Sequence, residues 1–370
     1  MAEPLTLTHE IINSWADDKN GPVALHLKQK LIPVEGEGAV IFPPTYADIG
    51  YNIDTLSDGT KVATIDSVGS QANRMEPIFK EERFAKLVPQ IDITYGNEKV
   101  VSILDAGHRL GDAIIRCTEL QKEAQGAFKQ FLDAGDVSAI AALAPTSLVF
   151  GVWDSRGTHA KLPRIVQSVI RAWDITELHR AAQYVPPLDY VAEDLLEEPK
   201  DKAEADLRSS KGYRHAPAIW RDEGRKEKVL GGVLARGPIE RNVTVNLIAL
   251  RRLGGSNALA LRRYILGLSL VAACEPVEAF LRAGCMVTPD PEAPARWASV
   301  ARDGKRVAMD LDDKAAKDYA EAVSRAHGVA APKRVNFDKK LAQEDLIDSA
   351  GKKGRGKGKT QPAPTAAATT

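Results

Sequence analysis

The sequence predicts an α+β fold, in which helices and strands share one core. Segments that alternate apolar and polar residues, as half-buried strands do, are interspersed with segments of helical period. Asp58 and Gly59 stand between two β-prone runs, which is the strongest short signal for a hairpin. Hairpins interrupt the strand–helix alternation of a regular doubly wound parallel sheet, so we expect an α+β core with large insertions.

The first hundred residues are expected to form a short helix, a long strand, the hairpin and a second helix. "THEIINSWA" predicts a helix with Thr8 as its N-cap, and "PVALHLKQKLIPV" predicts a strand. The hairpin covers "YNIDTLSDGTKVATID". A helix is expected to follow the polar stretch "SVGSQANRMEP", residues 67–77, and to end at about Leu87, before a strand in "KVVSILDA".

The middle of the chain is expected to contain one long helix. "HRLGDAIIRCTELQKEAQGAFKQFLDAG" places apolar residues on a single helical face, namely Leu110, Ile114, Cys117, Leu120 and Ala124. "PTSLVFGVWDSRG" predicts a strand that runs into a polar turn. "LPRIVQSVIRAWDI" fits a strand or a helix equally well.

The C-terminal half contains two segments that are poor in core residues. Residues 193–228 are dense in charge and are interpreted as a mobile insertion or loop. "VLGGVLARG" and "ERNVTVNLIAL" predict strands, and "NALALRRYILGLSLVAACEPVEAFLRAG" predicts an apolar helical region broken at Pro276. Residues 349–370 are expected to be a disordered basic tail, which leaves residues 1–348 as a single elaborated domain.

The composition excludes several classes of protein. The 50 basic and 50 acidic residues balance, which is not typical of a general polyanion binder. Cys117, Cys274 and Cys285 are too far apart for a zinc site or a disulfide framework, and we interpret them as small buried residues. The N-terminus does not resemble a signal peptide and no apolar run could span a membrane, so a cytoplasmic protein without membrane contact is expected.

The sequence contains no motif that names a reaction. Neither a nucleotide-binding glycine loop nor a nucleophile elbow nor a zinc-protease motif occurs, so no cofactor and no metal are expected. His108 and His159 are the better candidates for a general base, although a hydrogen-bonding role is the more usual one for a single histidine. Asp105 and Asp112 flank His108 at a spacing that equally fits helix capping.

Three polar clusters indicate a binder of RNA or of single strands. Arginine binds phosphate with two hydrogen bonds, and aromatic rings stack on unpaired bases. The alternative is that the arginines coat a solvated face and the tryptophans belong to the core. The first cluster is Ser70, Gln71, Asn73 and Arg74; the second is Trp153, Arg156, Lys161, Arg164, Arg171 and Trp173; the third is Arg241, Arg251, Arg252, Arg262 and Arg263.

Five motifs, over roughly residues 20 to 290, resemble one known family. They are "DSVGSQANRMEP", "LDAGHRLGDAIIR", "APTSLVFGVWDSRG", "KLPRIVQSVIRAWD" and "GGVLARGPIERNVTVNLIALRRL". Together and in this order they resemble the backbone subunit of type I-U (also called I-G) CRISPR effector complexes. That family belongs to the RAMP superfamily, and its members have the Cas-seven role in Cascade.

The resemblance implies an RRM-like (ferredoxin-like) palm with large thumb and finger insertions. It also implies a cytoplasmic antiviral-defense protein that is not an enzyme. Copies of it would form a head-to-tail filament along a CRISPR RNA, beside a large subunit and a guide-end-capping subunit, and present the spacer to a target DNA strand. Base pairing would read the sequence, so the protein needs no base-specific site. The insertion at 193–228 would then be either a thumb that contacts a neighbouring copy or a plain loop.

The resemblance also implies which residues contact RNA. Ser70, Gln71, Asn73 and Arg74 match a segment that cradles guide phosphates at a helix N-terminus, where free amides favour an anion. The alternative is that Ser70 caps the helix and Gln71 faces solvent. Further RNA-binding candidates are His108, Arg109, Trp153, Arg156, Lys161, Arg164, Arg241, Arg251 and Arg252.

Two alternatives remain open at these residues. Asp154 could form a structural ion pair with Arg156 that orders the turn. Some RAMP proteins are ribonucleases, and in that alternative His108, His159 or Asp154 would serve as the acid or base at the scissile phosphate of a guide precursor or a target RNA.

Overall fold

The computed structural model describes residues 4–47, 49–179, 183–217, 221–222, 225–226, 230–276 and 278–355. Its main element is an antiparallel sheet in the order β17-β18-β1-β16-β9-β4-β3, with β19 and β20 attached beside β1. The strands are β1 (Ala24–Pro33), β3 (Ile53–Thr55), β4 (Lys61–Asp66), β9 (Val166–Trp173), β16 (Ile239–Asn246), β17 (Phe280–Arg282), β18 (Cys285–Pro289), β19 (Trp297–Val300) and β20 (Arg306–Met309).

Four strands of this sheet are interleaved in a specific way. β16 pairs antiparallel with both β1 and β9, so β1 and β9 run parallel with β16 between them. In the same way β16 and β18 run parallel with β1 between them. Each parallel pair is joined through helices, which makes two split strand–helix–strand units in the order β18-β1-β16-β9.

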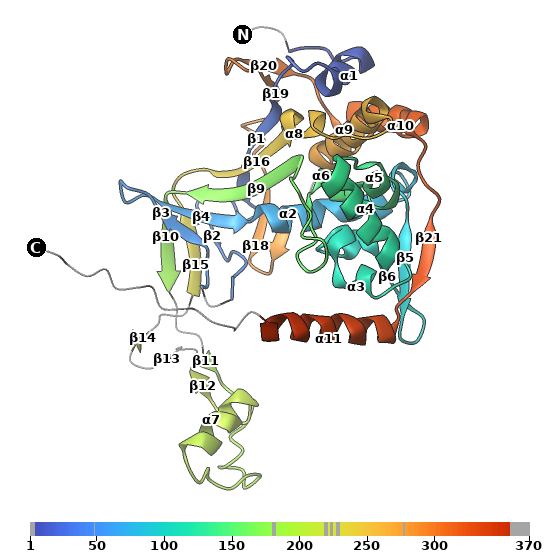
Figure 1. Ribbon diagram of the computed structural model, residues 1–370. Coiled ribbons are helices and arrows are strands. Elements are labelled where there is room, and N and C mark those ends of the chain that lie inside the picture. The colour runs from blue at the N-terminus through green and yellow to red at the C-terminus, as the bar shows by residue number, and fades with distance from the viewer. Residues whose placement is uncertain are drawn as a thin grey trace, which may run out of the picture.

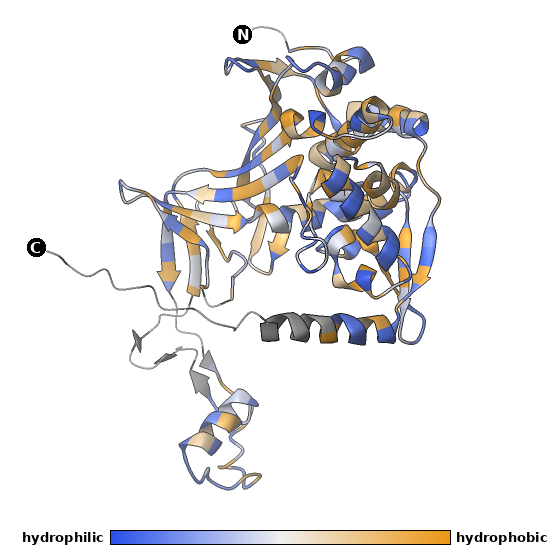
Figure 2. Ribbon diagram, viewed as in Figure 1, coloured by the Kyte–Doolittle hydropathy of each residue, from blue (hydrophilic) through white to orange (hydrophobic). Residues whose placement is uncertain are grey.

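The helices cover one face of this sheet (Figure 1). β1 turns Leu25 and Leu27 toward the core, and β16 turns Val243 and Val245 toward it, while the residues between them face the other side. This two-residue period produces the alternating bands along the strands in Figure 2. The covering helices are α1 (His9–Asp17), α2 (Val68–Met75), α3 (Ala113–Arg116), α4 (Gln121–Ala134), α5 (Ser138–Leu143), α6 (Thr146–Val149), α8 (Leu247–Arg251), α9 (Ala258–Cys274) and α10 (Asp313–His327).

Smaller elements surround this core. β2 (Val40–Ile41), β10 (Ile175–His179) and β15 (Leu230–Ala235) form a second sheet, which shares a second apolar cluster with strands of the main sheet. β5 (Ile91–Tyr95), β6 (Lys99–Ser102) and β21 (Lys333–Asn336) form a third, and β7 (Val152–Trp153) pairs with β8 (Lys161–Leu162). Beyond β10 the chain projects away from the body with α7 (Lys202–Ser210), β11 (Gln183–Tyr184), β12 (Ala216–Pro217), β13 (Arg221–Asp222) and β14 (Arg225–Lys226), and α11 (Lys339–Arg355) lies beneath the helices (Figure 1).

The mixed architecture agrees with the predicted α+β class, and several predicted elements are confirmed. Thr8 caps α1 by accepting a hydrogen bond from the amide of Ile11 at 3.4 Å. The hairpin at Asp58 joins β3 to β4, with Gly59 in the left-handed region at φ 86°. The ambiguous segment before Trp173 is the strand β9. Cys117, Cys274 and Cys285 are free; Cys117 and Cys285 are buried, as expected, whereas Cys274 is half-buried.

The predicted long helix from residue 108 to 135 is wrong. It is divided into α3 and α4, because the Thr118 hydroxyl donates to the carbonyl of Ile115 and accepts from the amide of Leu120, which ends one helix and starts the next.

Three further predictions need correction. Residues 146–149 form the helix α6 rather than a strand. The chain beyond α2 continues as two short 3₁₀ helices, Glu76–Lys80 and Ala85–Leu87, with Pro77 in the first. Beyond Pro276 the chain forms β17 rather than helix.

The termini and the insertion are only partly described. The predicted tail, 349–370, lies outside the described residues from 356 onward, and residues 349–355 belong to α11. The insertion 193–228 contains the helix α7 in its described part. None of the described helices combines the length and the hydropathy that a membrane crossing requires.

Candidate nucleic-acid interface

Four of the five motifs meet around one pocket of about 640 Å³, which we call the basic pocket. They come from α2, from the 3₁₀ turn Arg109–Gly111 and from the β7–β8 hairpin. Its lining contains cations and polar groups but no carboxylate: Gly69, Asn73, Gly107, His108, Arg109, Gly151, Val152, Trp153, Lys161, Leu162, Pro163, Arg164 and Gln167. Such a lining attracts an anion.

Arg109 forms the rigid floor of the basic pocket. It is buried and adopts the left-handed φ of 53°, which is uncommon for any residue but glycine. Its Nε lies 2.7 Å from Oε2 of Glu76, which is also buried, and its guanidinium lies over the ring of Phe150 at 5.2 Å. Arg109 therefore orders the pocket floor, while its ion pair with Glu76 neutralises most of its charge.

Burial of Glu76 affects its protonation. Desolvation raises the pKa of Glu76 to about 7, and the adjacent Arg109 charge opposes that rise. Arg109 itself stays charged, because an arginine pKa lies far above neutral even when burial lowers it. The charge of this pair therefore changes close to neutral pH.

Arg164 supplies the basic pocket with a positive charge that no carboxylate among the described residues neutralises. Its Nε is buried without a hydrogen-bond partner among the described residues, and none of the ion pairs found there includes Arg164. Gly151, with φ 77°, makes room for this side chain, because a Cβ there would lie 2.9 Å from Cγ of Arg164. A guanidinium held in place without a counter-ion is suited to bind a phosphate.

The rim of the basic pocket presents an exposed aromatic ring. Trp153 is 56% exposed, and Nζ of Lys161 lies 5.5 Å from the centroid of its indole. Asp154 is buried beneath and accepts from the amides of Gly157 and Thr158 and from the Thr158 hydroxyl. These bonds order the turn, and no ion pair joins Asp154 to Arg156 among the residues that the structure describes.

Helix α2 reaches the basic pocket with its first turn and with Asn73. Ser67, not Ser70, is the N-cap, and its hydroxyl accepts from the Ser70 amide at 3.2 Å. Gly69 lines the pocket, and its amide has no intrahelical acceptor because it lies in the first turn. Oδ1 of Asn73 accepts from Arg109 at 3.4 Å, which joins α2 to the pocket floor.

The other side of α2 belongs to a buried polar network. The Asp66 carboxylate accepts from Nε2 of Gln71 at 2.6 Å and from Nε of Arg74 at 3.0 Å. Oε1 of Gln71 accepts from the Ser168 hydroxyl at 2.6 Å, and Nε of Arg241 donates to that hydroxyl at 3.1 Å. Asp66, Gln71, Ser168 and Arg241 are all buried. We call this chain the α2 network.

The α2 network corrects the roles expected for three residues. Gln71 neither faces solvent nor reaches the basic pocket, because both ends of its amide are bonded inside the protein. Arg74 also donates to the carbonyls of Phe280 and Leu281, so its contacts tie α2 to β17 rather than complete an anion clamp. Burial lowers the pKa of Arg241 to about 10, and its place beneath α2 removes it from any RNA contact.

The remaining candidates lie outside the basic pocket. Both terminal nitrogens of Arg251 donate to carbonyls, those of Trp15 and Pro22, at 2.8 Å. Ser70, Arg156 and Arg252 are not part of its lining. Of the thirteen candidates, the structure gathers six in the basic pocket: Asn73, His108, Arg109, Trp153, Lys161 and Arg164.

The histidines lack the setting of a general base. The Asp112 carboxylate caps α3 through the amide of Ile114 and accepts from the backbone amide of His108, both at 3.1 Å, so it does not orient the imidazole. His159 is exposed and lies outside the basic pocket. None of the described residues forms a group of His, Cys, Asp or Glu suited to a metal.

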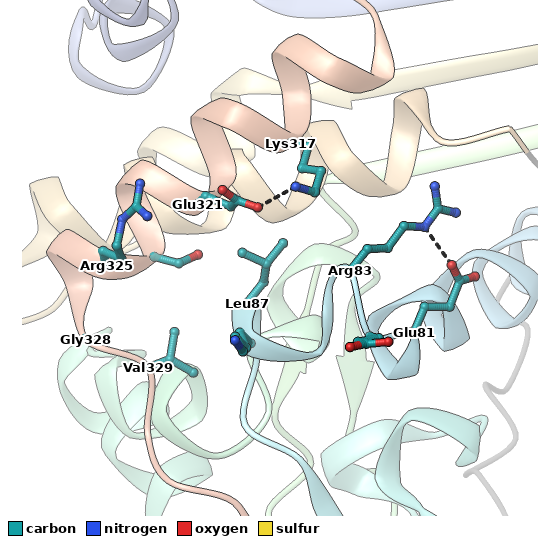
Figure 3. A pocket seen from close by; sticks show the side chains of 11 residues that line it. Glu81, Arg83, Leu87, Lys317, Glu321, Arg325, Gly328 and Val329 are labelled. Carbon is teal, nitrogen blue, oxygen red and sulfur yellow. Dashed lines mark hydrogen bonds and ion pairs between the residues drawn. The ribbon is translucent and has the colours of Figure 1, made fainter.

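A larger pocket, of about 970 Å³, lies between Glu81–Leu87 and α10 (Figure 3). Its charges are mixed and partly paired, since Lys317 bonds to Glu321 at 2.6 Å and Arg83 to Glu81 at 2.8 Å. The mixture of signs does not favour a phosphate, so the basic pocket remains the candidate interface.

The sequence reasoning missed the residues that support the basic pocket. Glu76 bonds to Arg109, and Ser168 bonds to Gln71, each from a distant segment, and a single sequence does not indicate such partners. Asp66 was missed although it lies only five residues from Gln71 and eight from Arg74. Gly69 and Gly151 lie within the quoted motifs. A glycine beside a cluster of hydrogen-bond donors indicates a close approach to the backbone, so these two could have been predicted from the sequence.

The comparisons with known proteins agree with the motifs. Residues 25–177 match the family model described as CRISPR-associated protein GSU0053. A chain from a solved "CRISPR RNA-guided surveillance complex, pre-nicking" matches with 13% identity over 88% of this chain and 99% of that chain, at a TM-score of 0.35, which is too low to support an argument. No curated protein matches. The resemblance to a CRISPR-associated family is thus confirmed over residues 25–177, the part of the chain that this family model matches.

Proposed function

We propose that the protein is the CRISPR RNA-binding backbone subunit of a type I-U/I-G Cascade complex. The observation that carries the proposal is the basic pocket, whose lining contains no carboxylate and is built by four of the five motifs on which the resemblance rests. The family match over residues 25–177 includes the whole of this pocket. In this role the protein is not an enzyme; it holds the guide and presents its bases to a target DNA strand.

The order of the central strands supports an RRM-like palm. Two split strand–helix–strand units in the order β18-β1-β16-β9 are the arrangement of a ferredoxin-like domain. The long connection between β9 and β16 then carries the insertion that would act as a thumb.

The basic pocket suits the sugar-phosphate chain of the guide. Arg164 and the Gly69 amide offer unpaired donors to one phosphate, while Lys161 offers a second charge. The exposed face of Trp153 can stack on a base of any identity. A guide of any sequence would therefore be held, as the function requires.

The subunit would assemble with copies of itself along the guide, together with a large subunit and a guide-end-capping subunit. Balanced charge supports this arrangement, because acidic faces can then meet basic ones while the basic pocket remains free for RNA.

A RAMP-type endoribonuclease is the second candidate. One observation favours it, namely that His108 is exposed and lines the basic pocket. Purified protein would cleave labelled RNA in this case, and the activity would be lost in His108→Ala.

The test is co-expression with a matching CRISPR array, followed by measurement of particle mass, of the 260/280 nm absorbance ratio and of RNA length. Wild type should carry RNA of discrete length, and Arg164→Ala should lower RNA affinity about 10-fold or more, because hydrogen bonds to charged groups contribute about 1.5–3 kcal/mol. Arg325→Ala is the matched control, since Arg325 is an exposed arginine at the pocket of Figure 3. Equal losses in the two variants would contradict the proposal.

A further inference from the structure

One face of the central sheet is covered by no helix, and it begins at the basic pocket. Neither of the two apolar clusters contains a side chain from this face of β1, β16 and β9. Gln167 belongs to both regions, because it lines the basic pocket and lies on the uncovered face of β9.

Strand register continues this face as a straight row. Gln167 is opposite Thr244, Thr244 is opposite His26, and His26 is opposite Ala298. Ala298 is in turn opposite Ala308 on β20. Four strand spacings of about 4.8 Å give the row a length of about 19 Å. We call this row and the adjacent Lys28, Asn242 and Arg306 the open row.

The open row is polar, and one of its two cations, Arg306, forms no ion pair with a carboxylate among the described residues. Arg306 is exposed, lies 3.4 Å from Nδ1 of His26, and has no carboxylate partner among the described residues. Lys28, 61% exposed at its side chain, pairs with Glu240 at 2.7 Å, and that glutamate is the acid nearest to the row in the sheet register. Burial, and then the Arg306 charge, lower the pKa of His26, so its ring is neutral at pH 7.

These properties decide between a protein and a nucleic acid as the occupant. A stable protein interface has an apolar centre, whereas the middle of this row is threonine and histidine followed by two alanines. On this face β1 and β16 present no phenylalanine, tyrosine or tryptophan, unlike RRM domains that read bases by stacking, and the one aromatic residue of β9 on this face, Trp173, lies at the far end of that strand from Gln167. Hydroxyl, amide, imidazole and guanidinium groups are suited to contact sugar and phosphate.

We propose that single-stranded RNA leaving the basic pocket at Gln167 continues across the open row to Arg306. This inference rests on the proposed function and extends it: the guide would be held along the uncovered sheet face through its backbone and would not depend on its base sequence.

The salt dependence of binding tests the inference. The full chain would bind a labelled oligouridylate of about 16 nucleotides, the upper range for a single-strand-binding fold, at several salt concentrations. Each phosphate contact contributes about 0.7 to the slope of log K against log salt for single strands. Arg306→Ala and Lys28→Ala should each lower that slope by about 0.7, and Arg325→Ala should leave it unchanged.

The outcomes separate this inference from the proposed function. If Arg164→Ala lowers the slope but Arg306→Ala and Lys28→Ala do not, RNA does not contact the open row, and this inference is wrong. The proposed RNA contact at the basic pocket would be unaffected by that result. An unchanged slope with a smaller assembly mass in Arg306→Ala would make this face a subunit contact and would also overturn the inference. Wild-type protein that binds no oligouridylate would count against both proposals.

Discussion

The two sides of helix α2 differ in whether their polar groups have partners. On the inner side, Gln71 and Arg74 use their side-chain donors on Asp66, and Arg74 adds two backbone carbonyls. On the outer side, the Gly69 amide has no acceptor within the helix, and Nε of the facing Arg164 has no partner among the residues that the structure describes. The motif that contains α2 thus includes residues that stabilise the fold and residues that could bind a ligand. They are distinguished by whether their polar groups have hydrogen-bond partners within the protein, not by residue type.

Removal of the centre of the α2 network should have the largest effect on stability. Asp66→Ala removes the acceptor of two charge-assisted hydrogen bonds and leaves Nε2 of the buried Gln71 without its acceptor, so we expect a loss of about 4 kcal/mol in the free energy of unfolding. Urea denaturation measures it. RNA affinity measured on the folded fraction should stay within a factor of about 2, and a large loss of affinity at unchanged stability would reverse our assignment of the two sides.

Glu76, which pairs with Arg109 at the floor of the basic pocket, should make the stability of the protein depend on pH. Its folded pKa of about 7 lies above the ordinary value of 4.5, so the folded state binds this proton more tightly than the unfolded state does. The contribution is fully present below pH 4.5 and is lost as pH rises through 7, with a ceiling of about 3 kcal/mol. Denaturation at a series of pH values should show this fall in wild type, and Glu76→Gln should flatten it. The same slope in both proteins would exclude Glu76 as the source.

The smallest expected effect comes from the outer side. In Gly69→Ala the new Cβ would meet nothing closer than Nη2 of Arg164 at 3.9 Å, so the variant should gain about 0.5 kcal/mol of stability through helix propensity. The added methyl would crowd the Gly69 amide and Arg164, and RNA affinity should fall. Thermal denaturation would measure the stability, and the anisotropy of labelled RNA would measure the affinity, on the same samples. Lower stability with unchanged RNA affinity would contradict the assignment of Gly69 to the outer side.

The sequence predicted local structure better than it predicted which side chains bond to one another. The Asp58–Gly59 hairpin and the Thr8 cap depend on neighbouring residues and were confirmed. The division of the long helix depends on one hydroxyl, that of Thr118, which the apolar period does not reveal. The burial of Gln71 and Arg241 depends on Ser168, which is 97 residues from Gln71 and 73 from Arg241. A pattern of residue types does not indicate contacts between residues so far apart in the chain. Hydrogen-bond donors with and without partners in the fold therefore cannot be distinguished in the sequence.

The pairing of the central strand β1 has a consequence for synthesis of the chain. Ala24 pairs with Asn246, 222 positions later. At roughly 5–20 residues per second, the ribosome needs about 10 to 45 s to complete that partner. During this time both edges of β1 lack their final neighbours, and unpaired strand edges are sites of aggregation. The central sheet therefore closes only after most of the chain has been translated, and the yield of folded protein in the cell should depend on how well the early strands are shielded until then.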